Sequence, residues 1–410
     1  MSSTPLDRDT AAGLDAADPL GHLRARFALP GELIYLDGNS LGPLPVGVAD
    51  RMRDTIEREW GQDLIKSWNS AGWIDLPLRT GARIARLVGA AEDEVVVTDS
   101  TSVNLFKLLV AAARLRPGRR VVVTESTTFP TDGYIAAAVA EILGLELRWC
   151  DRADPVAAVG DDTAVLALNH VDYRGGHLLD LEAVTRRAHE RGALVLWDLC
   201  HSAGVVPVDL DESGADLAVG CGYKYLNGGP GAPAFCFVAK RLHDELRQPL
   251  TGWMGHAEPF AMARDYTPAA GTTRLQAGTP PVLSLAALDA ALDAVEGVEV
   301  ADLRRKSLRL TGTFLDLVRA YTDLEVLTPA DDRRRGSQVS LRHPRAYGVV
   351  QALIARGVVG DFREPDVARF GFAPAYLRYI DVWDAVQQLV AVLQGEEYAD
   401  PAYSSRSPVT

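Results

Sequence analysis

The stretch ALVLWDLCHSAGVVPVDLDESGADLAVGCGYKYLNGGPG, residues 193–231, contains two short apolar runs, each followed by a turn. ALVLWDL and ADLAVG are apolar for most of their length instead of alternating, which is typical of parallel strands buried on both faces. Asp198 ends the first run, and Lys224 follows the second and precedes a glycine-rich turn. Because open α/β folds bind ligands at the rim where their strands end, we expect both side chains at one rim.

The same rhythm of a β-branched run, a turn and a longer amphipathic stretch extends from about residue 95 to residue 240. Within it, ELRWC (146–150) is interpreted as another of the buried strands. This pattern predicts an α/β fold with a mostly parallel sheet between layers of helices. Residues 44–60 carry apolar side chains at four-residue spacing after a proline, and they predict one helix docked on this domain.

The C-terminal part of the chain changes to long helices and short strands, which predicts a smaller α+β domain. We place the large domain at residues 46–285 and the small domain at residues 1–45 plus 286–410. The tails, residues 1–25 and 396–410, are rich in polar residues, alanine, proline and serine. They are expected to be loosely held.

The bulk composition limits the possible partners. The net charge of -13 argues against a nucleic-acid partner. No uncharged stretch approaches the ~18 residues of a membrane span, and the N-terminus lacks an export signal, so we expect a cytoplasmic protein without a membrane partner. The four cysteines stand singly, which predicts buried thiols in a reducing compartment and no metal site.

Lys224 and Asp198 together suit one kind of chemistry. A lysine amine desolvated at the end of a buried strand is a nucleophile toward an aldehyde. A carboxylate there could bind a protonated pyridine nitrogen, while the imidazole of His201 lies against the ring. Such a cationic ring accepts electrons from the α-carbon of an amino acid. The simpler alternatives are a surface lysine and an aspartate that only caps the next turn.

Two more segments follow predicted strands. Thr101 and Ser102 lie where a helix is expected to begin, and the N–H groups at a helix N-terminus bind anions such as a cofactor phosphate. Phe129 begins the segment FPTD (129–132) and could stack on a planar ring. A plain N-cap and a core phenylalanine are the respective alternatives.

Together these segments resemble the kynureninase family, within the fold type I pyridoxal-phosphate enzymes that share the aspartate-aminotransferase-like fold. The resemblance covers nearly the whole chain, and its motifs occur in the family's order. The matching segments are YLDGNSLGPLP (35–45), SWNSAGWI (67–74), DSTSVNLFK (99–107), FPTD (129–132), LNHVDYRGG (168–176), WDLCHSAG (197–204), GCGYKYLNGGPG (220–231), GWMGH (252–256), QAGTPP (276–281) and RFGFAPAY (369–376).

The resemblance implies pyridoxal 5'-phosphate as the cofactor. Lys224 would form the Schiff base, Asp198 would bind the pyridine nitrogen, and Tyr223 is the candidate proton relay. The implied cofactor contacts are Thr101, Ser102, Phe129, Pro130, Thr131, Asp132, Asn169, Asp198, His201, Tyr223 and Lys224, with the partner subunit's Trp253 and the partner subunit's Thr279. The phosphate end would be held by Thr101, Ser102, Asp132 and Tyr223. An obligate homodimer with shared active sites follows from this set.

The implied reaction is the hydrolysis of L-kynurenine to anthranilate and L-alanine through a quinonoid and a ketimine, with 3-hydroxy-L-kynurenine as a second candidate substrate. The substrate carboxylate would bind Arg369, with Arg378 as the competing candidate. Trp68 and Trp73 offer ring faces to the arylamine, and core packing is their alternative. Ser40, in the GNS turn, could also reach the substrate.

Three other functions stay open from the residues alone. A cysteine desulfurase or selenocysteine lyase of the same fold uses a cysteine in the C-terminal half, and no cysteine follows Cys236 here. An aminotransferase would begin with the same proton abstraction. A non-catalytic binding module would be expected to have lost Lys224 or Asp198. The preference between the two kynurenines and the pathway that uses the product are left open.

Overall fold

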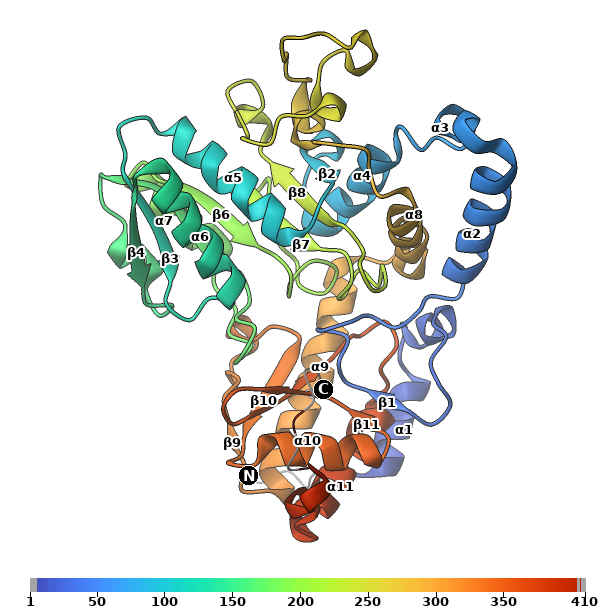
Figure 1. Cartoon of the computed structure of the whole chain (residues 1–410). Coiled ribbons are helices and arrows are strands. Elements are labelled where there is room, and N and C mark those ends of the chain that lie inside the picture. The colour runs from blue at the N-terminus through green and yellow to red at the C-terminus, as the bar shows by residue number, and fades with distance from the viewer. Residues whose placement is uncertain (1–5, 404–405, 407–410) are drawn as a thin grey trace. The chain divides into compact units, whose positions relative to one another are not determined.

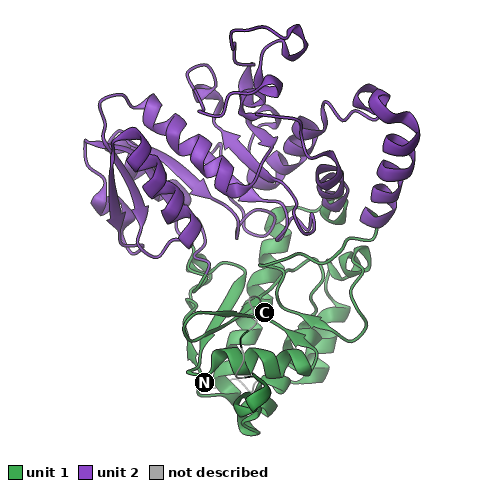
Figure 2. Ribbon diagram, in the orientation of Figure 1, with its two compact units in different colours: residues 1–47, 174–178, 293–410 green, residues 48–173, 179–292 purple. Residues whose placement is uncertain are grey.

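The computed structural model describes residues 6–403 and residue 406. The chain forms two compact units (Figure 2): a large unit of residues 48–173 and 179–292, and a small unit of residues 1–47, 174–178 and 293–410. Parts of the two tails that we predicted to be loose, residues 1–5, 404–405 and 407–410, lie outside the described residues.

The large unit is built on a seven-stranded sheet with the strand order β2-β8-β7-β6-β5-β3-β4 (Figure 1). β8 is antiparallel to both of its neighbours, and the other strand pairs are parallel. The predicted mostly parallel sheet is therefore confirmed. The strands are β2 (Val95–Val97), β3 (Val121–Glu125), β4 (Glu146–Cys150), β5 (Thr163–Asn169), β6 (Leu194–Asp198), β7 (Leu217–Cys221) and β8 (Ala234–Val238).

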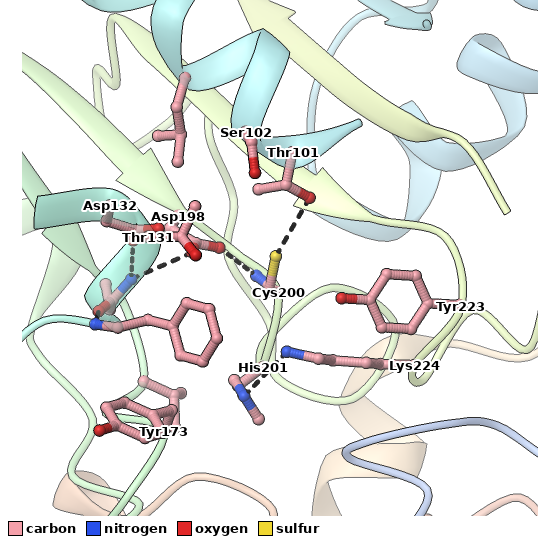
Figure 3. Close-up of a pocket in the computed structure, with 14 residues that line it drawn as sticks. Thr101, Ser102, Thr131, Asp132, Tyr173, Asp198, Cys200, His201, Tyr223 and Lys224 are labelled. Atoms are coloured by element: carbon pink, nitrogen blue, oxygen red, sulfur yellow. Dashed lines mark hydrogen bonds between the residues drawn. The ribbon is translucent and has the colours of Figure 1, made fainter. Parts of the chain in front are cut away.

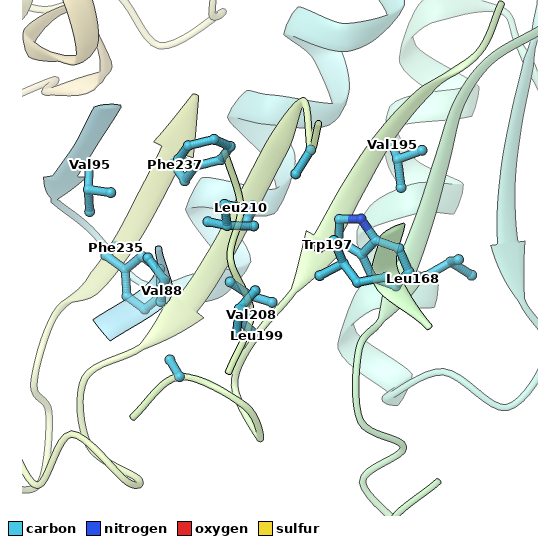
Figure 4. Packing of buried hydrophobic residues seen from close by; sticks show 14 of the residues in the cluster. Val88, Val95, Leu168, Val195, Trp197, Leu199, Val208, Leu210, Phe235 and Phe237 are labelled. Atoms are coloured by element: carbon cyan, nitrogen blue, oxygen red, sulfur yellow. The ribbon is translucent and has the colours of Figure 1, made fainter. Parts of the chain in front are cut away.

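Helices cover both faces of this sheet, as its apolar strands require. α5 and α6 lie side by side on one face, where Leu108 and Val139 join one apolar cluster. α4, α7 and α8 contribute to a second cluster on the other face, which contains Trp197 and Phe235 (Figure 4). The helices of the large unit are α2 (Val48–Asp54), α3 (Ser67–Ser70), α4 (Leu76–Val88), α5 (Thr101–Leu115), α6 (Pro130–Leu143), α7 (Leu181–Glu190) and α8 (Val282–Ala291).

Two expectations for the large unit are wrong. β4 is the edge strand of the sheet and is not buried on both faces, since the Trp149 side chain is 50% exposed. The single docked helix predicted over residues 44–60 is instead α2 followed by a π-helical segment, Thr55–Asp63. Ile56 and Trp60 in that segment are 44% and 56% exposed, so its apolar spacing does not correspond to a buried face.

The small unit combines short strands with helices, as an α+β pattern predicts. Its four-stranded antiparallel sheet has the order β12-β13-β10-β9, and β1 pairs with β11 separately. β13 and α10 were not predicted from the sequence. The elements are β1 (Ile34–Tyr35), β9 (Glu325–Val326), β10 (Gln338–Arg342), β11 (Val358–Val359), β12 (Asp361–Arg363), β13 (Val367–Gly371), α1 (Arg8–Ala16), α9 (Val300–Tyr321), α10 (Ala346–Ala355) and α11 (Tyr379–Gln394).

The N-terminal segment is held more firmly than its composition predicts. α1 packs on α11, and Leu23 is fully buried. Lys306 of α9 forms a buried ion pair with Asp18 at 2.7 Å. The expectation of a loose tail is therefore wrong for residues 8–25. None of the helices in the described part of the chain combines the length and the apolar character needed to cross a membrane.

Candidate active site

A pocket lies where β5 and β6 end and the turn after β7 begins (Figure 3). Its lining includes every implied single-subunit cofactor contact except Pro130, which begins α6. The structure therefore brings these residues together at the rim of the sheet. The lining residues are Thr101, Ser102, Leu105, Phe129, Thr131, Asp132, Asn169, Val171, Tyr173, Asp198, Cys200, His201, Tyr223 and Lys224.

Lys224 is positioned by the turn that follows β7. Asn227, in the left-handed region at φ 57°, donates its backbone N–H to the carbonyl of Lys224 at 2.9 Å. The Lys224 side chain points into the pocket, where Nζ lies 3.1 Å from Nε2 of His201 (Figure 3). An amine and an imidazole at this distance can exchange a proton directly. Lys224 is therefore not the solvated surface lysine of the simpler alternative.

Asp198, at the end of β6, belongs to a network of two carboxyl groups and one amide. The Asn169 side-chain amide donates to Asp132 at 2.6 Å and to Asp198 at 3.1 Å. The backbone N–H of Cys200 donates to the other oxygen of Asp198 at 2.7 Å. Asp198 is 8% exposed, so these hydrogen bonds fix its direction toward the pocket.

Asp132 lies beside Asp198 and not in the position that the resemblance implies. We expected it to hold a phosphate, but its carboxyl group is hydrogen bonded to Asn169 and Asp198. Burial, followed by the negative charge of Asp198, raises the pKa of Asp132 well above its usual value. Two buried carboxyl groups in contact cannot both ionise readily, which favours the protonated form of Asp132.

The N-terminus of α5 forms another side of the pocket. Ser100 caps this helix by accepting a hydrogen bond from the Val103 backbone N–H at 3.4 Å, and Thr101 and Ser102 begin its first turn. Thr101 Oγ1 also lies 3.8 Å from the sulfur of Cys200. N–H groups and hydroxyls at a helix start suit an anionic group such as a phosphate.

Aromatic side chains complete the lining. The Phe129 ring meets Tyr173 edge to face, with 5.2 Å between centroids, and Phe129 is 41% exposed. Burial, and then the neighbouring Cys221 thiol, raises the pKa of the Tyr223 phenol. Tyr223 therefore keeps its proton at neutral pH and can donate it.

Several predicted site residues lie elsewhere. Trp68 lies in the short helix α3, and Trp253 and Thr279 are accessible on the large unit outside the pocket lining. Ser40 and Arg369 belong to the small unit. No group of three or more potential metal ligands occurs among residues 6–403 and 406.

Comparison with known proteins identifies the family. The model for the kynureninase C-terminal domain matches residues 303–389. A kynureninase from Pseudomonas fluorescens is 51% identical to this chain, with 98% of this chain and 99% of that protein covered. The chain belongs to the kynureninase family. A kynureninase from Burkholderia mallei, strain SAVP1, is 50% identical with the same coverage.

Solved structures with lower identity confirm the fold of this kynureninase-family chain. The cysteine desulfurase of Thermococcus onnurineus NA1, in its apo form, superposes with a TM-score of 0.77 at 18% identity and covers 97% of this chain and 99% of its own. A cysteine desulfurase of Escherichia coli gives a TM-score of 0.75 at 20% identity, covering 92% and 98%. At such identities the likeness concerns the fold alone, which is fold type I.

The small unit of this kynureninase-family chain holds Arg369 in a buried cluster. Arg369 on β13 lies directly opposite Asp361 on β12. Its Nε donates to Asp361 at 2.8 Å, and its Nη2 donates to Asp361 and, at 2.8 Å, to Ser40 Oγ. Two residues that were predicted separately as substrate contacts are therefore neighbours. Arg378, the competing candidate, instead pairs with Asp381 at the start of α11.

Asp37→Asn is expected to change how the stability of the protein depends on pH. Burial, and then the charge of Asp361, raises the pKa of Asp37 to about 7, from about 3.9 in an unfolded chain. Between those pH values the unfolded chain has lost this proton while the folded chain retains it, so the free energy of unfolding falls as pH rises. Asn carries no such proton.

Urea unfolding at about pH 5 and about pH 8 checks this expectation. The Asn variant should gain about 1–2 kcal/mol relative to the unsubstituted protein between the two conditions. If the difference in the free energy of unfolding between the two proteins is the same at both pH values, the raised pKa of Asp37 beside Asp361 is contradicted.

Four lining residues were not predicted: Leu105, Val171, Tyr173 and Cys200. Cys200 was interpreted as a buried thiol, but it is half-buried because it lies in the turn after β6 and faces the pocket. The sequence feature that could have indicated Cys200 as a lining residue is its position two residues after Asp198. Tyr173 carries no local signal, since only the fold brings it to Phe129.

Proposed function

We propose that this chain hydrolyses L-kynurenine to anthranilate and L-alanine with pyridoxal 5'-phosphate as its cofactor. The observation that carries the proposal is the meeting of Lys224, Asp198 and the α5 N-terminus in one pocket, in a chain about half identical to kynureninases over its length. These groups suit the three parts of the cofactor, because an amine binds the aldehyde, a carboxylate binds the ring nitrogen, and helix N–H groups bind the phosphate.

The donor set assigns each part of the cofactor to residues of this chain. Lys224 would hold the aldehyde carbon covalently, and Asp198 would bind the protonated ring nitrogen. Thr101 and Ser102 would receive the phosphate, and the Phe129 ring would cover one face of the pyridine. When bound, the cofactor supplies an electron sink for the α-carbon of the substrate.

Protons are moved by the side chains next to that carbon. Lys224 takes the α-proton as general base, and the His201 imidazole, 3.1 Å from its amine, shares that proton. Tyr223, whose phenol stays protonated because burial raises its pKa, donates to the side-chain carbonyl or the β-carbon of the substrate. Asp132, whose pKa is raised by burial and by the charge of Asp198, is proposed to stay neutral beside it.

Arg369 is the proposed receptor of the substrate carboxylate. Guanidinium groups bind carboxylates through two parallel hydrogen bonds, and the cross-strand pair with Asp361 fixes the plane of this one. Ser40 contacts the same guanidinium and can reach the same ligand.

Arg369→Ala is expected to raise the KM for L-kynurenine by about 100-fold, because a charge-assisted pair of hydrogen bonds is lost. Arg378→Ala is the matched control, and its KM should stay within about twofold, since Arg378 pairs with Asp381 at the start of α11. Steady-state kinetics and a cofactor titration measure both effects. An equal loss of cofactor affinity in Arg369→Ala would indicate a folding defect and not a lost substrate contact.

Trp68 is the proposed contact for the arylamine ring. It meets Trp73 edge to face with 6.0 Å between centroids. Trp73 in turn donates its indole N–H to the buried Glu59 at 2.9 Å, so the second ring is fixed and supports the first. An aromatic pair of this kind offers a rigid apolar face to a flat ligand.

The protein is proposed to act as a cytoplasmic homodimer. Trp253 is 37% exposed and Thr279 is also accessible, which suits residues that complete the site of a second copy. Phe260 and Met262, near Trp253 in the chain, are 67% and 74% exposed, and apolar side chains of this size are usually covered by a partner. The four cysteines form no disulfide, which agrees with a reducing compartment.

A product assay tests the proposed reaction. The protein, supplied with pyridoxal 5'-phosphate, is incubated separately with L-kynurenine, 3-hydroxy-L-kynurenine and L-cysteine. We expect anthranilate and alanine to appear in equal amounts from L-kynurenine. Sulfide from cysteine without any anthranilate would favour a desulfurase instead, and transfer of the amino group to a keto acid would favour an aminotransferase.

A further inference from the structure

We infer that Cys200 and Cys221 form an oxidisable thiol pair that a peroxide closes to a disulfide at the floor of the pocket. The inference starts from the register of two neighbouring parallel strands. Asp198 on β6 lies opposite Val219 on β7, and the Leu199 backbone N–H continues the ladder to the Val219 carbonyl at 2.8 Å. β6 ends at Asp198, and Cys200 lies in the turn that follows it, beside Cys221, which is the last residue of β7.

This placement meets the distance requirement for a disulfide. Neighbouring strands lie about 4.8 Å apart, within the ~4.4–6.8 Å between Cα atoms that a disulfide spans. The Cys221 sulfur contacts the Cys200 carbonyl at 3.9 Å, and the two thiols are hydrogen bonded to each other.

The two thiols differ in access and in acidity. Cys200 lines the pocket, whereas Cys221 is 3% exposed. Burial raises the pKa of Cys221, but the hydrogen bond from Cys200 and the charge of Lys224 outweigh it, and the pKa lies below its usual value. The same hydrogen bond and burial raise the pKa of Cys200, so the pair loses its first proton at Cys221, and a proton passed from Cys200 to Cys221 gives the pocket-facing sulfur the thiolate form that reacts.

Hydrogen peroxide supplies the oxidising equivalents. The Cys200 sulfur attacks one peroxide oxygen, the O–O bond breaks, and water leaves a sulfenic acid on Cys200. Cys221 then attacks that sulfur, the S–O bond breaks, and a second water leaves. Overall, two thiols and one peroxide give one disulfide and two waters, and a dithiol reductant reverses the result.

Closing the bond alters the cofactor pocket. The sulfurs must approach to about 2.05 Å, which draws Cys200 toward β7. Its backbone N–H then shifts from Asp198, which it now meets at 2.7 Å, and its sulfur moves away from Thr101. On the proposed function, pyridoxal phosphate should bind the oxidised protein about tenfold more weakly.

Peptide mapping of the full-length protein tests the pair without requiring cofactor or substrate. The protein is treated with hydrogen peroxide, alkylated and digested without reduction. Trypsin leaves both cysteines in one peptide, because no lysine or arginine lies between Gly192 and Lys224. A second cleavage, after Glu212, is therefore needed to place them in separate fragments. We expect a cross-link between the two resulting fragments that a reductant removes.

Matched variants assign the cross-link. Cys221→Ala should leave a sulfenic acid on Cys200 that dimedone traps, while Cys150→Ala and Cys236→Ala, which replace buried cysteines outside the pair, should retain the cross-link. If a variant fails to fold, the map of the unsubstituted protein decides by itself. Two outcomes would overturn the inference. In the first, Cys200 and Cys221 remain fully alkylatable after peroxide treatment and unfolding. In the second, the cross-link joins two copies of the chain.

Discussion

Lys224→Ala is expected to lower kcat with L-kynurenine by at least about 1,000-fold, because the variant loses both the covalent anchor of the cofactor and the general base. The amine lies 3.1 Å from the His201 imidazole, and the variant loses this proton-sharing contact as well. Steady-state anthranilate production, measured by fluorescence with saturating pyridoxal 5'-phosphate, gives the loss.

Lys240→Ala is the matched control for this variant. Lys240 is exposed and pairs with Asp93 at 2.7 Å, away from the pocket lining. Its replacement should leave kcat within about twofold, since exposed ion pairs contribute little. Retention of full activity by Lys224→Ala would remove Lys224 from the mechanism.

Asp198→Asn is expected to lower kcat by about 1,000-fold, which corresponds to about 4 kcal/mol of transition-state stabilisation. The amide has the same shape as the carboxylate, but it cannot hold a positive charge on the ring nitrogen, and the ring then accepts electrons poorly. The expected loss is therefore in kcat more than in KM, and stopped-flow kinetics of α-proton removal should show it directly.

The two carboxyl groups of the pocket are expected to differ. Burial and the charge of Asp198 raise the pKa of Asp132 and favour its protonated form, for which the amide in Asp132→Asn is a close substitute. Its kcat should fall by about tenfold or less, the effect of one altered hydrogen bond. Equal losses in the two variants would show that the carboxyl groups share the negative charge.

Much of the pocket could be predicted because parallel strands place their ends at one rim. Continuous apolar runs predicted β6 and β7, and this alone brings Asp198 and the Lys224 turn together. The raised pKa of Asp132 could not be predicted, since it depends on burial and on contacts with Asn169 and Asp198 from other strands. Sequence spacing does not contain such contacts.

The wrong expectations have a common physical cause. Apolar composition predicted burial for the strand ELRWC, but a strand at the sheet edge has a neighbour on one side only, and Trp149 is half exposed there. The spacing of Ile56 and Trp60 is helical, yet the chain forms a π-helical turn and leaves both exposed. Burial depends on which element lies opposite, and the local pattern does not determine that.

The pairing of Arg369 with Asp361 shows the same limit. Eight residues separate them in the sequence, and their contact arises from the antiparallel register of β12 and β13. The motif that contains Arg369 indicated a role for this residue. It did not indicate that Ser40, more than 300 residues earlier, would contact the same guanidinium.

The site of covalent attachment tests the account most directly. The protein carrying pyridoxal 5'-phosphate is reduced with borohydride and digested with trypsin, and the modified peptide is sequenced by mass spectrometry. A modified lysine resists trypsin, so we predict a labelled peptide from Gly192 to Lys240 with the adduct on Lys224. An adduct on Lys66, Lys107, Lys240 or Lys306, or no adduct on a protein that forms anthranilate, would contradict the account.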